Sequence, residues 1–537
     1  IGAKIMFFHQ RDTRIAMKIV YLHAKNLKKL QTVKILTNIQ IKEWDKYTIE
    51  NEPVSSIDLM ERAARTLTAA IVRKWGKEIP VTLFAGPGNN GGDTLAIARM
   101  LSEQGYKTNT FLFNTSDKLS ADCAVNKERL LACENASFTE VSTQFNPPAL
   151  SKGDLVVDGL FGSGLNKPLN GGFAAVVKFI NASPATVVSI DVPSGLMGED
   201  NSYNVRQNII QADLTLSIQM PKLSFLFPEN EEFTGHWELL DIGISREYIA
   251  QAETRYFITE EQEMRQLIRP RRTFAHKGNF GHGLLIAGSY GMGGAAVLAA
   301  RACMRSGIGL LTVHSPICNH QLLQTIVPEA MVQDDVHERF FAEPTDLDNY
   351  QAMAIGPGLS QEEITAQAAL DQVSNCFIPL VLDADALNIF SAYRSYLNRL
   401  PKHSILTPHV KELERLVGRC SNSFERLSKA KELAGELQVY IILKGAWTTV
   451  ITPEGNCYFN PTGNPGMATG GSGDVLTGIL LSLLAQGYTQ EEACRLGVYI
   501  HGLAGDIACM RMGEISMTAG DIVNALPEAW KKLTTSK

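Results

Sequence analysis

Short apolar runs that end in a glycine-rich turn and lead into a helical stretch recur along this chain of 537 residues. The first such run covers residues 80–85, continues into a loop with four glycines over residues 86–93, and is followed by a helical pattern over residues 94–101. Comparable runs end near Asp158, Asp191, Ser289, Asp383 and Lys444. Strands that alternate with helices form mainly parallel sheets, so both halves of the chain are predicted to be α/β.

The pattern divides the chain into three segments. Residues 1–32 carry seven Lys or Arg side chains and a single acid, Asp12. We interpret them as a non-native or disordered leader, with the working chain beginning near Val33. Residues 33–250 and 251–537 are predicted to form two domains, with the linker near residues 255–263, where the sequence is mixed, charged and without a glycine turn.

Charge and cysteine usage exclude several classes of protein. The formal net charge is −6, from 50 Lys and Arg against 56 Asp and Glu, whereas a nucleic-acid-binding surface needs a basic excess. No apolar run reaches the roughly 18 residues of a membrane span. The nine cysteines are scattered and include no CxxC pair, which is typical of a reducing compartment. We therefore expect a cytoplasmic protein without a nucleic-acid or membrane partner.

A stretch near the C-terminus indicates phosphate chemistry. Residues 464–474 read NPGMATGGSGD, and an apolar helical run follows over residues 475–484. Glycines allow backbone N–H groups to turn inward, and the start of a helix adds partial positive charge, so the stretch suits a phosphate. An acid does not help to bind an anion. Asp474 is therefore either a helix N-cap or a base that acts beside the phosphate.

The first half contains a second group of polar side chains at strand ends. Asn90 lies in the first glycine loop, Asp158 and Asp191 each end a strand, and Ser194 follows Asp191. In a parallel sheet these loops gather at the carboxyl edge, so the four side chains are expected to meet. Their oxygen atoms suit K⁺, Na⁺ or Mg²⁺ rather than zinc. Asp158 and Asp191 as turn or capping residues remain the alternative.

The three motifs at 86–93, 157–165 and 189–196 resemble, in that order, those of the NAD(P)H-hydrate epimerase domain, over about residues 37–245. The resemblance implies a Rossmann-like three-layer domain that interconverts the R and S forms of hydrated NADH and NADPH. It implies K⁺ bound by Asn90, Asp158 and Ser194, and Asp191 as the catalytic residue that handles the proton. The implied substrate-binding residues are Asn89, Asn90, Gly91, Gly92, Asp93, Gly162, Ser163, Gly164, Leu165, Asn166, Lys167, Pro168 and Asp191.

The second half, over about residues 260–530, resembles the ADP/ATP-dependent NAD(P)H-hydrate dehydratase, a ribokinase-like α/β domain. The resemblance rests on motifs 276–278, 356–358, 383–388, 407–409 and 444–445 and on the stretch 464–474. It implies that the S hydrate is phosphorylated by ADP, with Mg²⁺, and then loses phosphate to restore NAD(P)H, leaving AMP. Asp474 is implied to be the base. The residues implied to face the hydrate are Ala296, Gly358, His409 and Asp474, and those implied to bind nucleotide are Lys444, Gly445, Ala446, Trp447, Thr448, Gly470, Gly471, Ser472 and Gly473.

Several alternatives remain open at this point. His409 taken alone is more often a structural histidine, and Asp383 and Asp385 could be helix caps. The whole chain could instead be a ribokinase-like small-molecule kinase fused to a nucleotide-binding domain, or a nucleotide-sensing protein with a decayed site. We also expect a homo-oligomer.

Overall fold

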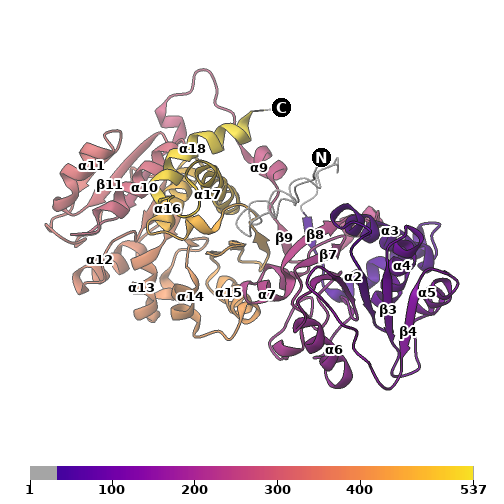
Figure 1. The fold of residues 1–537 in the computed structure, drawn as a ribbon. Helices are drawn as coiled ribbons and strands as arrows, with labels where there is room; N and C mark the ends of the chain where they lie inside the picture. The colour runs from indigo at the N-terminus through magenta and orange to yellow at the C-terminus, as the bar shows by residue number, and fades with distance from the viewer. Residues whose placement is uncertain (1–32, 536–537) are drawn as a thin grey trace. The chain divides into compact units, whose positions relative to one another are not determined.

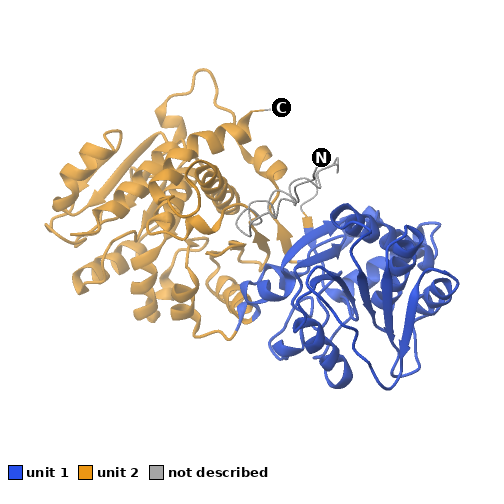
Figure 2. Ribbon diagram, in the orientation of Figure 1, with its two compact units in different colours: residues 1–29, 34–254, 422–424 blue, residues 30–33, 255–421, 425–537 orange. Residues whose placement is uncertain are grey.

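The computed structural model describes residues 33–535, and these form two compact units (Figures 1 and 2). The first unit contains residues 34–254 and 422–424, and the second contains 255–421 and the chain from 425 onward. The leader predicted over residues 1–32 lies outside the described residues. Within the described range, no helix combines the length and apolar character needed to cross a membrane.

The first unit is built on a parallel sheet in the order β4-β3-β2-β5-β6-β7-β8. Successive strands step outward from β2 to β4 on one side and from β5 to β8 on the other. The direction therefore reverses between β2 and β5, where ligands bind in open α/β sheets. The strands are β2 (Val81–Ala85), β3 (Thr108–Phe113), β4 (Ser137–Val141), β5 (Leu155–Gly159), β6 (Thr186–Ile190), β7 (Leu214–Ile218) and β8 (His236–Leu240).

Helices of this unit begin where the sequence offers capping residues. Thr37 and Gln40 form a capping box, and the Ser55 hydroxyl accepts the N–H of Asp58. Buried aliphatic side chains of α3 and α4 pack on β2 and β5 to form the main core. The described chain opens with strand β1 (Val33–Ile35). The helices are α2 (Asn38–Asn51), α3 (Ser56–Lys74), α4 (Asn89–Glu103), α5 (Ala121–Leu131), α6 (Gly171–Asn181), α7 (Glu231–Thr234) and α8 (Arg246–Gln251).

Two expectations for this half were wrong. The helix after the first glycine loop begins at Asn89 rather than Thr94, so Gly91 and Gly92 lie in its first turn. A Cβ on Gly91 would lie 1.7 Å from the Gly86 carbonyl oxygen, so this glycine is required for the helix to approach the loop. The outer strands β4 and β8 were also missed, because strands at a sheet edge carry mixed polar and apolar residues.

The second unit contains a larger mixed sheet in which the order runs β9-β18-β17-β16-β15-β14-β13-β10-β11-β12. Strands β16, β17 and β18 pair antiparallel, with a hairpin about residues 453–455 between β17 and β18, and the other pairs in this order are parallel. The strands are β9 (Tyr256–Ile258), β10 (His282–Ile286), β11 (Leu310–Ser315), β12 (Met331–Asp334), β13 (Ala352–Ile355), β14 (Leu380–Leu382), β15 (Ile405–Leu406), β16 (Tyr440–Leu443), β17 (Thr449–Ile451) and β18 (Cys457–Phe459).

The segment expected to be a linker, residues 255–263, is instead part of this unit. Strand β9 pairs parallel with β18, and a helix begins at Glu261. The charged composition that suggested a linker belongs to an element with one buried end, at Ile258. The predicted α/β class holds for both halves.

Helices α10 and α16 are packed at backbone distance in the second unit, among α17 and α18 (Figure 1). A Cβ on Gly478 of α16 would lie 2.0 Å from the Ala299 carbonyl oxygen of α10, so only glycine permits this approach. The helices are α9 (Glu261–Leu267), α10 (Gly293–Arg305), α11 (His320–Ile326), α12 (Glu363–Ser374), α13 (Ala384–Ala392), α14 (Val410–Val417), α15 (Ser423–Leu437), α16 (Ser472–Ala485), α17 (Gln490–Met512) and α18 (Ala519–Thr534).

Candidate active sites

The polar side chains predicted to meet in the first unit do converge at the carboxyl ends of β2, β5 and β6. A Cβ on Gly162 would lie 3.0 Å from Asn90 Oδ1 and 3.1 Å from Asp191 Oδ2, so both side chains face this glycine. The N–H of Ser163 donates to Asp191 Oδ2 at 3.0 Å. The Asn90 side-chain nitrogen is buried without a hydrogen-bond partner, and a buried amide usually has one.

Asp158 is a completely buried carboxylate. Its Oδ2 accepts the Ser189 hydroxyl at 2.7 Å and the Ser194 N–H at 2.8 Å. Among residues 33–535 no basic side chain pairs with it, and burial raises its pKa despite these hydrogen bonds. Its Oδ1 accepts the Leu160 N–H at 3.4 Å. A buried carboxylate in this state fits a bound cation, which would replace the missing positive charge.

Asp191 is bound to a buried lysine that the sequence reasoning missed. Lys222 Nζ lies 2.7 Å from Asp191 Oδ1, and the lysine is only 2% exposed. Burial would raise the pKa of Asp191, but the charge and hydrogen bond of Lys222, with the Ser163 N–H, hold it below the ordinary value. Asp191 also has φ of 63°, a conformation that strains a residue with a side chain.

Two further carboxyl groups lie in the electrostatic field of Asp191. Burial and then the charge of Asp191 raise the pKa of Asp93 well above its ordinary value. The same two causes raise the pKa of Asp45, on α2, to about 6, against the opposing charge of Lys222. Asp45 and Lys222 were missed because neither follows a glycine turn. The only signal for Lys222 is its position just after the apolar strand β7.

In the second unit the central feature is a buried ion pair. Lys444 Nζ lies 2.9 Å from Asp383 Oδ1, and Thr477 donates to Asp383 Oδ2 at 2.7 Å. Burial would raise the pKa of Asp383, but Lys444 and Thr477 outweigh it and lower the pKa. Asp383 stands at the N-cap position of α13 without making a side-chain cap bond. Asp385 instead accepts the Ser360 N–H at 2.9 Å, so neither aspartate is a helix cap through its side chain.

Asp474 lies beside this ion pair without a cation of its own. The N-cap of α16 is Gly471, at φ of 89°, so the N-cap interpretation of Asp474 was wrong. The helix starts at Ser472 and places Asp474 in its first turn. A Cβ on Gly473 would lie 3.3 Å from Lys444 Nζ. Burial, then the charge of Asp383, raises the pKa of Asp474 to about 7, with Lys444 opposing.

The glycine stretch before α16 is held from both ends. Asp506 of α17 accepts the N–H of Gly463 and the side-chain amide of Asn464, both at 3.0 Å. The Ser472 hydroxyl lies 3.4 Å from His501 Nε2. Burial lowers the pKa of His501 to about 4, so this imidazole is neutral beneath the stretch. These contacts hold the stretch at residues 463–464 and at the Ser472 side chain.

His409 has a structural task in addition to its predicted contact with the hydrate. Its Nδ1 accepts the N–H groups of Lys411 and Glu412 at 3.0 and 3.3 Å, which caps α14. Burial and the charge of Lys444 lower its pKa, so the ring is neutral. The side chain remains 48% exposed, and Nε2 faces Glu412 at 3.3 Å.

Gly358 and Ala296, which were also predicted to face the hydrate, lie at and near the start of α10. A Cβ on Gly358 would lie 2.8 Å from the Met292 carbonyl oxygen and 2.9 Å from Ala295 Cβ, so the 356–358 loop packs on the start of α10. Ala296 follows in α10 and is fully buried. Residues 444–448 follow β16, where the Gly445 N–H donates to the Thr448 hydroxyl at 3.3 Å.

Metal-binding capacity differs between the two units. The described residues include no group of three or more His, Cys, Asp or Glu side chains that could hold a metal ion. In the first unit the available oxygens are those of Asn90, Asp158 and Ser194, which suits a hard monovalent ion. In the second unit the carboxylates fit Mg²⁺ only as part of a shell completed by nucleotide phosphates, the usual arrangement for this ion.

Comparison with known proteins gives a consistent result over both units. The family model described as YjeF-related protein N-terminus matches residues 56–224, and the model described as NAD(P)H-hydrate dehydratase matches residues 283–528. A bifunctional NAD(P)H-hydrate repair enzyme of Thermofilum pendens is 34% identical over 519 residues, covering 93% of this chain and 97% of that protein. The protein of the same description from Escherichia coli is 33% identical, covering 85% and 86%.

Among solved structures, the ADP/ATP-dependent NAD(P)H-hydrate dehydratase from Bacillus subtilis, co-crystallised with ATP/Mg²⁺, is 35% identical. The match covers 51% of this chain and 98% of that chain, with a TM-score of 0.46.

Proposed function

The chain belongs to the family of bifunctional NAD(P)H-hydrate repair enzymes, and we propose that Asp191 and Asp474 are the centres of its two activities. The first unit interconverts the R and S forms of hydrated NADH and NADPH. The second unit dehydrates the S form with ADP as the phosphoryl donor. The observation that carries this division is that each unit holds one aspartate beside a glycine-rich loop and a lysine, in opposite protonation environments.

The dehydratase step is phosphorylation followed by elimination. Asp474 accepts the proton of the hydrate hydroxyl as its oxygen bonds to the β-phosphorus of ADP and the bond to AMP breaks. The N–H groups of residues 470–473 and the Lys444 ammonium stabilise the charge on the transferring group. Phosphate then leaves with the C–O electron pair, the adjacent carbon loses a proton, and the double bond of NAD(P)H returns. A carboxylate with a pKa of about 7 suits the proton transfer at neutral pH.

Mg²⁺ would accompany ADP in this unit and neutralise phosphate charge. Asp383 is already held by Lys444 and Thr477. We therefore place the ion chiefly on the phosphates, with at most one or two protein carboxylates.

The epimerase step breaks and re-forms the C–O bond at the carbon that carries the hydroxyl, and its proton transfers take place at oxygen. The hydroxyl leaves with a proton from an acid, the ring nitrogen supplies the electrons for a transient C=N bond, and water adds to the other face. Asp191 is held as a carboxylate by Lys222 and takes the proton from that water. K⁺ bound by Asn90, Asp158 and Ser194 would supply the positive charge that buried Asp158 lacks and would fix the loops around the nicotinamide.

The remaining residues bind the two nucleotides. Those proposed for the epimerase substrate lie in the first turn of α4 and in the partly exposed loop 162–168. Those proposed for ADP lie in 444–448 and 470–473. Ala296, Gly358 and His409 are proposed on the hydrate side, Ala296 through the backbone because its side chain is buried.

A single assay tests both activities. A mixture of R and S hydrates is incubated with ADP or ATP, and the return of NADH absorbance is followed. Complete conversion requires both sites, whereas a plateau at the S fraction would show an inactive epimerase. No return of absorbance with either nucleotide would contradict the dehydratase proposal. Vitamin alcohols as phosphate acceptors in the same mixture test the kinase alternative.

A further inference from the structure

A turn after β12, residues 335–343, is fastened to the glycine loop that precedes α10, residues 288–292. The N–H of Tyr290 donates to the Arg339 carbonyl oxygen at 2.9 Å. The Arg339 guanidinium carbon lies 4.1 Å from the centre of the Tyr290 ring, which is cation–π distance. Two segments about 50 residues apart in sequence therefore present one aromatic ring and one guanidinium together.

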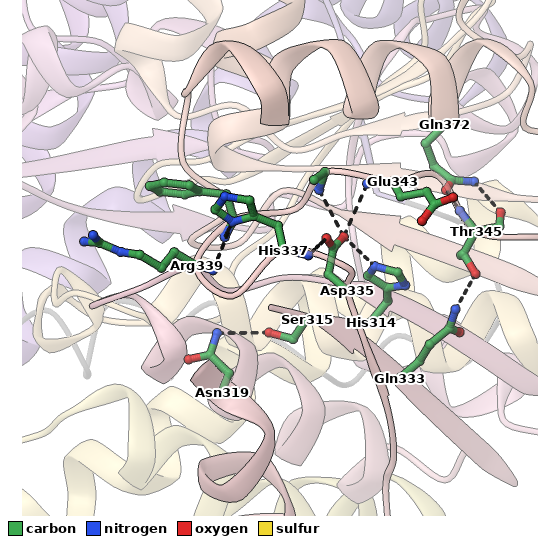
Figure 3. Close-up of polar contacts among 12 residues, drawn as sticks. His314, Ser315, Asn319, Gln333, Asp335, His337, Arg339, Glu343, Thr345 and Gln372 are labelled. Carbon is green, nitrogen blue, oxygen red and sulfur yellow. Dashed lines mark hydrogen bonds and ion pairs between the residues drawn. The ribbon is translucent and has the colours of Figure 1, made fainter. Parts of the chain in front are cut away.

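The 335–343 turn is rigid because a buried carboxylate closes it from inside (Figure 3). Asp335 accepts His314 Nε2 and the N–H of His337 at 2.9 Å, and the N–H of Ala342 at 3.0 Å. His337 Nδ1 in turn accepts the N–H of Arg339 at 3.1 Å. Hydrogen bonds thus hold the backbone of Arg339 at both its N–H and its carbonyl oxygen.

The glycine loop belongs to the hydrate side of the dehydratase site. The Met292 carbonyl oxygen lies 2.8 Å from a Cβ placed on Gly358, so the loop abuts a residue proposed to face the hydrate. It also leads directly into α10, which packs on α16, the helix whose first turn contains Asp474. Tyr290 and Arg339 therefore border the part of the site where the dinucleotide must extend away from Asp474.

The ADP site lies in the opposite direction along the sheet. The loop after β10 is separated from the loop after β16 by β13, β14 and β15, so four strand spacings, roughly 19 Å, lie between them. Arg339 follows β12, two strands beyond β10 on the side away from β16. A single ADP held by residues 444–448 and 470–473 has no reason to reach Arg339.

Tyr290 and Arg339 are both exposed at the surface. Tyr290 is 61% exposed, and in the described part of the chain Arg339 forms no ion pair with a carboxylate. A free guanidinium is suited to phosphate, and an exposed ring beside it is suited to a base. We propose that Arg339, supported by Tyr290, binds a phosphate of the adenylate half of the hydrated dinucleotide in the dehydratase site. This inference rests on the proposed dehydratase function and identifies a specificity-determining residue for it.

The test is Arg339→Gln in the full chain, with Arg399→Gln as the matched control. Arg399 is also an exposed arginine over a tyrosine, 4.6 Å from the Tyr396 ring. Arg399 lies in the 3-10 helix that follows the C-terminus of α13, whereas Asp383 precedes the N-terminus of α13. Arg339→Gln is expected to raise KM for hydrated NADPH and NADH roughly tenfold to a hundredfold, the range for losing a charged hydrogen bond. The kcat value and the KM for ADP should change little, and Arg399→Gln should match the wild type.

A salt titration separates phosphate binding from a structural role. Wild-type KM for hydrated NADPH should rise with ionic strength more steeply than that of Arg339→Gln, because only the wild type retains the screened contact. Arg339→Lys should recover part of the loss, because it keeps the positive charge that meets the phosphate. If Arg339→Gln instead lowers kcat and keeps the wild-type dependence of KM on ionic strength, the substitution has disturbed the turn. That result would overturn the proposal.

The outcomes also separate this inference from the function on which it rests. If the wild type fails to restore NADH from hydrate, the dehydratase proposal itself is wrong. If the wild type is active and Arg339→Gln keeps the wild-type KM for hydrate, only the role of Arg339 is wrong. A rise in the KM for ADP alone would assign the guanidinium to the other nucleotide and overturn the proposal.

Discussion

The two units each place an aspartate beside a lysine, but the lysine is used differently. In the first unit Lys222 pairs directly with Asp191 at 2.7 Å, and the aspartate stays ionised although it is buried. In the second unit Lys444 pairs with Asp383, and the less buried Asp474 has a pKa of about 7. Burial therefore does not decide the protonation state by itself. The position of the one available cation decides it.

The most severe test of this comparison is Asp474→Asn. An amide cannot accept the hydroxyl proton, so dehydration should fall by about 10²–10⁴-fold. The rate of R/S interconversion, measured on the same preparation by chromatography of the two hydrates, should be unchanged. Retained dehydration would remove Asp474 from the base role.

The reciprocal change is Asp191→Asn in the first unit. It should reduce interconversion by a comparable factor, about 10²–10⁴-fold, because the carboxylate held by Lys222 is lost. Dehydration of purified S hydrate should continue at the wild-type rate. A variant that loses both activities would show that the two units do not act separately.

Removing Lys222, the counterion of Asp191, leaves Asp191 without a paired cation, as Asp474 is in the second unit. Lys222→Met leaves a buried carboxylate uncompensated, and the expected loss is about 3–5 kcal/mol in the free energy of unfolding of this unit. The double variant Lys222→Met with Asp191→Asn should lose less than Lys222→Met alone, because the unpaired charge is removed. Denaturant titrations of the three variants measure the difference, and additive losses would contradict the direct pairing.

The smallest expected effect concerns pH. Asp474 must be ionised to accept a proton, so kcat/KM for dehydration should decline about tenfold per pH unit below about pH 7. Asp383→Asn removes the charge that raises the pKa of Asp474 and releases Lys444, so the decline should move to lower pH. Asp191 has a lowered pKa, and its ionisation should impose no decline on the epimerase near pH 7. An unmoved dehydratase profile in Asp383→Asn would assign the titration to another group.

Strand-terminal residues could be predicted from sequence, whereas their counterions could not. Asp158, Asp191 and Ser194 end or follow apolar strands, and parallel topology brings such positions together. Lys222 follows a strand as well, but nothing local shows that a lysine will be buried. Its burial is favourable only because Asp191, 31 residues earlier, occupies the same space. Asp383 and Lys444 are likewise 61 residues apart.

The starts of the two helices that follow glycine loops were predicted poorly for a related reason. Asn89 and Ser472 both begin helices earlier than the apolar pattern indicates, because the first turns consist of glycine and polar residues. These turns are stabilised by contacts from other elements, such as Gly91 against Gly86 and Ser472 beside His501. The residues proposed to bind the ligands are therefore the ones whose local structure the sequence specifies least.

The contact between Gly478 and Ala299 gives a chemically inert position a kinetic importance. Helix α10 carries the proposed hydrate side of the dehydratase and α16 carries the proposed phosphoryl side, and the two backbones meet where a Cβ would lie 2.0 Å from a carbonyl oxygen. Adding one methyl group at Gly478 would push donor and acceptor apart without touching either substrate. Phosphoryl transfer depends on the close alignment of donor and acceptor. Residue 478 is therefore restricted to glycine although it takes part in no chemical step.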